Sequence, residues 1–297
     1  MRWEPSVAPD LWRVVGPVYR NSTRKVEILF QKNRHVEHHE KILGYKVFRQ
    51  SHGIRTNIKD CNINGKCHFV VDLGSNDIYV TSYNTKGESP PAHVAMEQEG
   101  LAKPRNVQIT SVRAHGISVK WEAPISEKTL VYFLIEWIDH EEKQNNVLWK
   151  KIPSTNISAF ISENIKEGVR YNISLYAVYS DGVSNPVSSQ IYSVEMVPRL
   201  GPEVSVKETV KDKASVEWIP IPASEQRGFI TCYSIYLTKM SDGAPTEPLK
   251  YVVESFKTHY MLSGLTSDKM YSVHMTASTS AGEGPSGKKK HFRTGKI

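Results

Sequence analysis

One strand pattern recurs along this chain about every 100 residues, and such a recurrence constrains the fold more than any other feature. In two copies a tyrosine, Tyr171 or Tyr271, stands six residues after an isoleucine or leucine and eleven residues before a glycine. Apolar and polar residues alternate behind each tyrosine, as they do in a strand with one buried face. We therefore expect a chain of repeated β-domains.

Alternation at period two continues through most of the sequence. No segment combines the apolar period of a helix with helix caps, so we predict an all-β chain. An aromatic residue ends an early strand of each unit, as in a two-sheet Greek-key sandwich. The predicted core aromatics are Phe30, Trp121, Trp218, Tyr171 and Tyr271.

The first copy departs from the other two. If it is aligned on its glycine turn at Gly87, Ile78 and Val80 face inward and Asn76 occupies the tyrosine position. An alignment on Tyr79 would turn the apolar side chains outward, because a slip of one residue exchanges the two faces of a strand. We therefore predict that the first domain lacks the tyrosine.

Polar residues, glycine and proline interrupt the alternation at 96–107 and 195–204. These interruptions place three β-sandwich domains at 1–98, 101–197 and 200–297. Because the linkers are short, we expect the domains to form a rod with limited bending.

Two of the three cysteines lie close together. Cys61 and Cys67 flank an Asn-Gly turn signal that can bring their Cα atoms within bridging distance. We predict a disulfide that pins a local hairpin, the alternative being two free thiols. Cys232 alternates opposite the apolar residues of its strand, so it is either a free thiol or a partner in an intermolecular bond.

Three Asn-x-Ser/Thr triplets, at Asn21, Asn156 and Asn172, are candidate N-glycosylation sites. Asn172 is the most informative, because it alternates outward from the buried face of its strand. With the cysteine pair, these sites favour an oxidising, extracellular compartment.

The remaining charged and histidine motifs favour neither catalysis nor metal binding. The cluster His35, His38, His39 and Glu40 lacks the H-E-x-x-H arrangement of a zinc site and lies between two strand patterns. No Ser/His/Asp or Cys/His set is present in a nucleophile context. The net charge of +7 is spread along the chain, which favours a solvated surface over nucleic-acid binding. We expect no enzyme activity, no metal and no cofactor.

The run GEGPSG at 282–287 matches the glycine pattern of a dinucleotide-phosphate site. Such a site needs a helix after the turn, whose free N–H groups face the phosphate. No helical pattern follows, and Pro285 removes one N–H group. We interpret the run as the last turn of the repeated sandwich. The hypothesis that the chain is a nucleotide-dependent enzyme has no support besides this motif.

The units resemble fibronectin type III domains, which are immunoglobulin-like sandwiches, through Trp121, Trp218, the tyrosine spacing and the SAGEGP turn at 280–285. The order of seven runs resembles, more narrowly, the three membrane-proximal domains of tall class I cytokine receptors. These runs are DLWRV (10–14), KILGYKV (41–47), LIEWIDH (134–140), SAFISENIK (158–166), GPEV (201–204), RGFITCYSIYL (227–237) and TASTSAGE (276–283).

The resemblance implies a non-catalytic extracellular stalk that positions receptor chains at the cell surface for signalling through Janus-family kinases. Its partners would be other receptor chains and, through N-terminal domains outside this chain, a helical cytokine. The W-S-x-W-S motif of the cytokine-binding module is absent, Trp3 being at most a remnant of the sequence after it. No apolar run reaches the length of about 18 residues that spans a membrane.

We therefore expect the ligand-reading module, the membrane span and the kinase-binding tail to lie outside this chain, which is then either a fragment of a single-pass receptor or a soluble, secreted product. The alternative function is a cell-adhesion or scaffold protein that uses the same domains as spacers and interaction surfaces.

Overall fold

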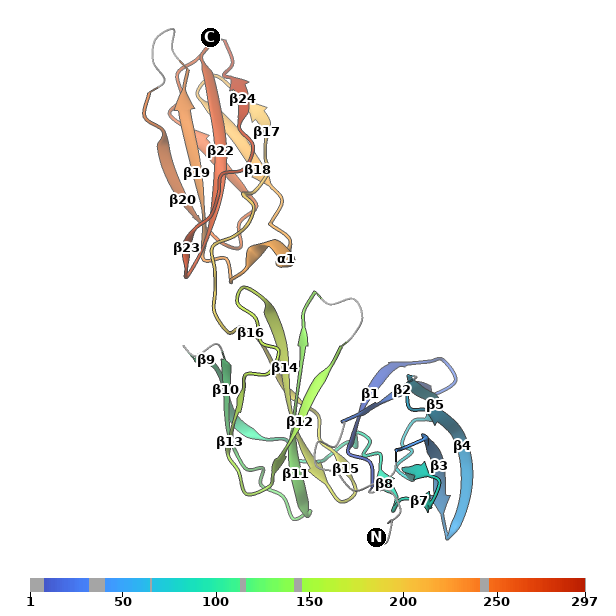
Figure 1. Ribbon diagram of the computed structural model, residues 1–297. Helices are drawn as coiled ribbons and strands as arrows, with labels where there is room; N and C mark the ends of the chain where they lie inside the picture. Colours follow the sequence, from blue (N-terminus) through green and yellow to red (C-terminus); the bar gives the residue numbers. More distant parts are fainter. Residues whose placement is uncertain are drawn as a thin grey trace.

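A computed structural model describes residues 8–31, 41–64, 66–112, 116–141, 146–240 and 246–296. These residues form three β-sandwich domains, each with one sheet of three strands and one sheet of five (Figure 1). The strand order is the same in every domain. The repeat in the sequence is therefore a repeat of topology.

In the first domain the smaller sheet has the order β1-β2-β5, and the larger has the order β4-β3-β6-β7 with β8 also on β6. The strands are β1 (Leu11–Val18), β2 (Thr23–Phe30), β3 (Gly44–Ser51), β4 (Ile54–Asn62), β5 (Cys67–Asp72), β6 (Ile78–Asn84), β7 (Gly87–Glu88) and β8 (Ala92–His93). Ile78 and Val80 are fully buried between the sheets, in agreement with the alignment on Gly87. Phe30 is half-buried and stacks on Tyr45, with ring centroids 3.7 Å apart.

In the second domain the orders are β13-β10-β9 and β12-β11-β14-β15, with β16 also on β14. The strands are β9 (Arg105–Val112), β10 (Gly116–Glu122), β11 (Leu130–Asp139), β12 (Leu148–Pro153), β13 (Ser158–Ile161), β14 (Arg170–Tyr179), β15 (Gly182–Val183) and β16 (Val187–Tyr192). Trp121 and Tyr171 lie in the core. The Tyr171 hydroxyl donates to the Asn164 carbonyl oxygen at 3.2 Å and accepts from the Lys166 N–H at 3.0 Å. Tyr171 thus fastens β14 to the loop before it.

In the third domain the orders are β17-β18-β21 and β20-β19-β22-β23, with β24 also on β22. The strands are β17 (Val204–Thr209), β18 (Lys213–Trp218), β19 (Cys232–Lys239), β20 (Leu249–Glu254), β21 (His259–Ser263), β22 (Met270–Thr279), β23 (Gly282–Glu283) and β24 (Lys290–Arg293). Trp218 and Tyr271 lie in the core. Tyr271 repeats the fastening contact, since its hydroxyl accepts from the Thr266 N–H at 2.9 Å.

A short helix interrupts the all-β pattern. In the described part of the chain it is the one helix, α1 (Ala223–Gln226), and it ends at Arg227, whose φ of 56° is left-handed. A helix of four residues is too short to display an apolar period, so the sequence pattern did not predict it.

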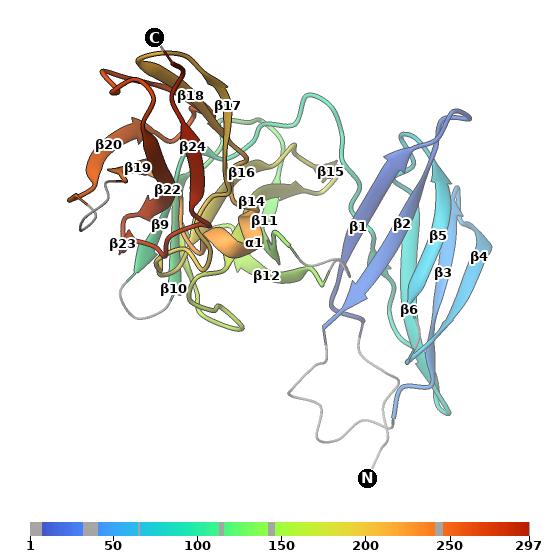
Figure 2. The same cartoon turned by 90° about the horizontal axis from the view of Figure 1, so that it is seen from above.

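The three domains do not form the expected rod. Figure 1 shows the second and third domains end to end, whereas the first domain lies beside the second, and the view from above in Figure 2 agrees. Short linkers limit how far two domains can separate, but they do not choose which surfaces meet. That choice is made by side chains at the contact between the first two domains.

Candidate functional site

The first two domains are joined by an apolar cluster that is separate from their cores. Its centre is Trp12 of β1, which is 1% exposed and meets the Tyr176 ring edge to face, with centroids 5.3 Å apart. Burial of one large apolar side chain contributes about 1.5–3 kcal/mol, so the cluster holds the domains at a set angle. Its members are Trp12, Ala95, Leu134, Trp149, Tyr176, Val178 and Val183, with Leu29 and Tyr132 at the margin.

The second domain has an apolar outer face where the other two domains have polar ones. Counted from the glycine turn, Val183 occupies the position of Glu88 in the first domain and Glu283 in the third. On the neighbouring strand Leu134 corresponds to Ser234. Strands that are apolar on both faces are covered on both. This pattern in β11 and β14 is the signal by which the sequence could have revealed the contact.

Glu136 orders the polar part of this joint. The half-buried carboxylate accepts hydrogen bonds from the Trp12 indole N–H at 2.8 Å and from the Tyr176 hydroxyl at 2.6 Å. Burial, with the adjacent Glu136 charge, raises the pKa of Tyr176, so the phenol keeps its proton and donates. Both aromatic rings are therefore oriented by hydrogen bonds as well as packed.

Arg13 brings a positive charge into the same joint. Its side chain is 2% exposed, with Nη2 3.6 Å from Glu97 Oε1 and Cζ 4.2 Å from the centroid of the Trp12 ring. Burial lowers the pKa of Arg13 and Glu97 opposes that shift. Glu97 also contacts Arg24 at 3.3 Å. Removal of Glu97 would take away one of the two carboxylates that compensate this buried charge, the other being Glu136, and would therefore destabilise the joint.

The linker itself pairs with the second domain. The Val183 N–H donates to the Met96 carbonyl oxygen at 2.9 Å, and the Gln98 N–H donates to the Val183 carbonyl oxygen at 3.0 Å. A Cβ atom added at Gly182 would lie 2.6 Å from Gln98 Cγ and 2.9 Å from the Met96 carbonyl oxygen. Only glycine at this turn lets the linker approach so closely.

Asn76, at the position where the other domains have a tyrosine, contacts the second domain at this joint. Its side-chain amide donates to the Asp181 carbonyl oxygen of the second domain. Its Oδ1 lies 3.5 Å from the Met96 N–H donor. The residue that departs from the repeat therefore binds the neighbouring domain instead of its own loop.

A second joint connects the second and third domains end to end. Arg170 donates to Gln226 Oε1 at 2.6 Å and to the Tyr192 hydroxyl at 3.0 Å. The Tyr192 and Phe229 rings meet edge to face, with centroids 5.0 Å apart. Gln226 belongs to α1, so the short helix supplies part of this joint.

The GEGPSG turn packs against the linker between the second and third domains. Gly284 and Gly287 donate their N–H groups to Ala277 and Met275 carbonyl oxygens, each at 2.8 Å. A Cβ atom at Gly287 would lie 2.0 Å from the Pro202 carbonyl oxygen. These glycines are explained by the close approach of the linker, and their N–H groups are used within the sheet.

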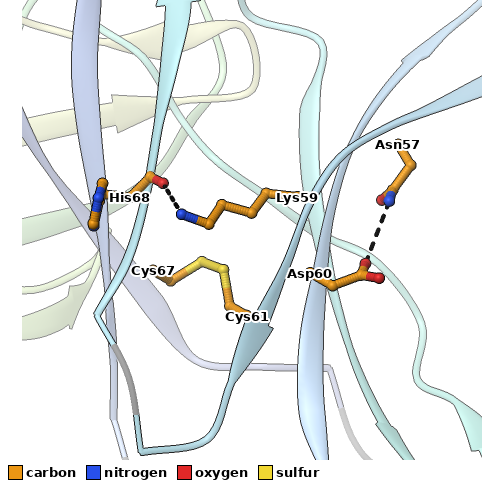
Figure 3. Close-up of a disulfide and its surroundings, with 6 residues drawn as sticks. All are labelled: Asn57, Lys59, Asp60, Cys61, Cys67 and His68. Atoms are coloured by element: carbon orange, nitrogen blue, oxygen red, sulfur yellow. Dashed lines mark hydrogen bonds between the residues drawn. A yellow bond between two sulfur atoms is a disulfide. The ribbon is translucent and has the colours of Figure 1, made fainter.

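The structure joins Cys61 and Cys67 by a disulfide (Figure 3). The two residues lie on β4 and β5, which belong to different sheets, so the bond does not pin a hairpin. It closes one edge of the sandwich, beside a hydrogen bond of 2.9 Å from Lys59 Nζ to the His68 carbonyl oxygen. Both cysteines are part of the first domain's core.

We expect the double substitution Cys61→Ser and Cys67→Ser to destabilise the first domain by about 2 kcal/mol, the chain-entropy value for so short a loop. Urea unfolding of the chain, followed by fluorescence, measures this loss. The third domain serves as the internal control, because none of its described residues contacts the apolar cluster that joins the first two domains and its transition should not move. A first-domain transition at an unchanged urea concentration would contradict the expected contribution.

The other sequence-predicted residues lie on the surface or outside the described residues. Asn21 and Asn156 are exposed in turns, whereas Asn172 faces outward but is half-buried, with its amide nitrogen 3.2 Å from His140 Nδ1. Cys232 is half-buried and free at the start of β19. The cluster His35, His38, His39 and Glu40 falls outside the described residues.

Within the described ranges, no group of three His, Cys, Asp or Glu side chains is placed to hold a metal ion. No helix in that same part of the chain is long and apolar enough to cross a membrane.

The outer faces of the first and third domains each carry one glutamate with several donors. Hydrogen bonds from Lys46 and Arg55 lower the pKa of Glu88 to about 2. Partial burial alone would raise the pKa of Glu283, but hydrogen bonds from Thr276, Tyr236 and Lys250 outweigh it and lower that pKa to about 2. These two clusters occupy the face that is apolar and covered in the second domain.

A carboxyl group whose pKa is lower in the folded state stabilises the fold above its unfolded pKa of 4.5 and loses that contribution as the pH falls towards 2. We therefore expect Glu88→Gln and Glu283→Gln to flatten the loss of stability in this pH range for the first and third domain, respectively. The effect should be modest, because both side chains are about one-third exposed. Thermal unfolding at a series of pH values measures it, with Glu163→Gln as the exposed control. If Glu88→Gln and Glu283→Gln both leave the dependence of the melting temperature on pH unchanged in this range, the role assigned to the two glutamates is contradicted.

Comparison with known proteins gives consistent matches. Residues 102–194 and 198–293 match the fibronectin type III domain family. Interleukin-31 receptor subunit alpha of Homo sapiens is 30% identical over 290 residues, which cover 96% of this chain and 38% of that protein. Interleukin-12 receptor subunit beta-2 of Mus musculus is 27% identical, over 97% of this chain and 34% of that protein. Interleukin-6 receptor subunit beta of Homo sapiens is 28% identical, over 99% and 31%. The chain thus spans less than two-fifths of the length of each of these relatives.

Proposed function

We propose that this chain is a stalk which sets the spacing and angle between receptor chains. The premise is that the chain belongs to the fibronectin type III family and corresponds to the fibronectin type III region of class I cytokine receptors. The family is non-catalytic, so the chain acts through geometry. In this proposal cytokine binding by domains outside the chain brings two receptor chains together. The stalk then places their associated Janus-family kinases within reach of each other.

The observation that carries the proposal is the packed joint between the first two domains. Trp12 and Arg13 are almost fully buried there, and Glu136 holds the Trp12 ring by a hydrogen bond of 2.8 Å. A stalk with a set bend transmits a change in the position of one end to the other, whereas a flexible linker averages it out. The bend is therefore the feature that we expect signalling to require.

Location at the cell surface, as the extracellular part of a single-pass membrane protein, belongs to the same proposal. The disulfide between Cys61 and Cys67 suits an oxidising compartment. Exposed Asn21 and Asn156 are open to glycosylation, and Asn172 is the least accessible of the three candidate sites. Other receptor chains and, through further N-terminal domains, a helical cytokine are the proposed partners.

A chimeric receptor tests the mechanical role. Residues 8–296 would replace the matching region of human Interleukin-6 receptor subunit beta, and cells expressing the chimera would be stimulated with that receptor's cytokine. We expect kinase phosphorylation from the chimera, and the loss of most of it when the chimera carries Trp12→Ala. Phe160→Ala, which removes an aromatic ring that is 44% exposed and outside both joints, is the matched control and should signal normally.

Surface expression and cytokine binding would be measured on the same cells, so that a loss of signal is assigned to geometry. Phosphorylation from the Trp12→Ala chimera that equals the unmodified chimera, at equal surface level, would refute the stalk mechanism.

A further inference from the structure

The outer edge of the third domain is open and apolar. The strand β20 (Leu249–Glu254) ends the strand order of its sheet, and within the described residues it pairs only with β19. Figures 1 and 2 place β20 on the flank of the third domain that faces away from the first domain. Leu249 is 61% exposed, Val252 is 64% exposed, and Phe256 just after the strand is 79% exposed.

The corresponding edges of the other two domains are protected. The strand β4 carries Arg55, Lys59 and Asp60, and its pairing with β3 has a register shift. The strand β12 carries two lysines and ends at Pro153, and its Trp149 lies in the joint with the first domain. Charges, proline and irregular pairing are the devices by which proteins keep edge strands from adding to another sheet. By contrast, β20 pairs with β19 without a shift, and its two charged residues, Lys250 and Glu254, are of opposite sign.

The order of side chains along β20 is self-complementary. On its outer face Lys250, Val252 and Glu254 follow one another at period two. If a second copy of β20 runs antiparallel with Val252 opposite Val252, each Lys250 lies opposite a Glu254. Opposite charges directly across a strand pair are favourable, and like charges are not.

We propose that two copies of this chain associate through β20, antiparallel and centred on Val252, so that the five-stranded sheets of two third domains continue into each other. The occupant of the open edge is a second copy because the strand's charges complement themselves about that centre. Lys250 now contacts Glu283 at 3.0 Å, with side chains 42% and 34% exposed, and Glu254 contacts Lys257 at 2.9 Å, with side chains 58% and 40% exposed. Exposed pairs of this kind contribute little, so sharing them across the dimer costs little.

The association is weak, because one pair of edge strands buries less surface than a stable dimer needs. The dissociation constant falls in the range of about 10–100 µM. This inference stands apart from the proposed function, since it concerns the chain alone in solution.

Sedimentation equilibrium of the full chain, over concentrations of about 1–200 µM, tests the proposal. We expect a monomer–dimer equilibrium that Val252→Lys abolishes, because it places two ammonium groups against each other. The matched control is Val70→Lys, at a valine of β5 that is 55% exposed, and it should leave the dimer intact. A chain that stays monomeric over the whole range, or a dimer that Val252→Lys does not weaken, overturns the proposal.

Charge exchange tests the register. Lys250→Glu alone and Glu254→Lys alone should each weaken the dimer about tenfold, because each places like charges opposite one another twice per dimer. The two substitutions together should restore the dissociation constant of the natural chain. Two single variants whose effects merely add in the double variant would rule out this register.

Oxidative cross-linking gives an independent readout. In a Cys232→Ser background, Val252→Cys should form a disulfide-linked dimer under mild oxidation, whereas Val70→Cys should not. Equal cross-linking of the two cysteine variants would mean random collision and would contradict a dimer centred on Val252.

Discussion

Trp12→Ala is expected to release the first domain from the second. The substitution removes a side chain that is 1% exposed and leaves Glu136 without its indole donor. Loss of a buried tryptophan costs about 3–5 kcal/mol, which here falls mainly on the contact between the domains. Small-angle scattering should show a larger radius of gyration. Calorimetry should show the first domain melting independently of the second.

Phe160→Ala provides the comparison for this result, since Phe160 lies on β13 in the other sheet of the second domain and is 44% exposed. Its scattering curve should match that of the unmodified chain. If Trp12→Ala also leaves the scattering curve unchanged, the linker contacts alone hold the bend.

Val183→Glu is expected to open the same joint from the side of the second domain. Val183 is fully buried, and its neighbour in the linker, Glu97, is already negative. A carboxylate without a partner at this position costs several kcal/mol, so the domains separate to hydrate it. Scattering and the independent melting of the first domain are the measurements, as for Trp12.

The reverse substitution, Glu283→Val, is a control that the repeat itself provides. It gives the third domain, at the position equivalent to Val183, the valine of the second domain. On the third domain, in the described part of the chain, no other domain covers that outer face. It removes the contacts of Glu283 with Thr276, Tyr236 and Lys250, and we expect a loss of about 1 kcal/mol from the third domain alone. The scattering curve should not change. If Val183→Glu also left it unchanged, the apolar face would not be what holds the first domain.

Much of each domain could be predicted from the sequence because it depends on local periodicity. Alternation placed Ile78 and Val80 inward, and both are fully buried. The spacing of Tyr171 and Tyr271 from their glycines predicted equivalent strands, and both hydroxyls contact the loop before the strand. These features are set by residues close in sequence, so a pattern of period two is sufficient to find them.

The two cysteines of the disulfide were predicted correctly, but the structural role of the bond was not. Cys61 and Cys67 are six residues apart, and that spacing suggested a hairpin. The chain between them instead crosses from one sheet to the other. A spacing of six residues fits such a crossing as well as it fits a turn within one sheet.

Sequence alone determined that this chain is three repeated β-sandwiches, that the first lacks the tyrosine, and that its residues resemble a receptor stalk. Tertiary structure alone decided that the first domain lies beside the second, with Trp12 and Arg13 buried between them and Asn76 bonded to the Asp181 carbonyl oxygen. The physical reason is that periodicity reports which side of a strand is apolar, whereas a contact between domains depends on which surfaces meet. The apolar outer face around Val183 was present in the sequence. Only the fold showed that Trp12, far away along the chain, covers it.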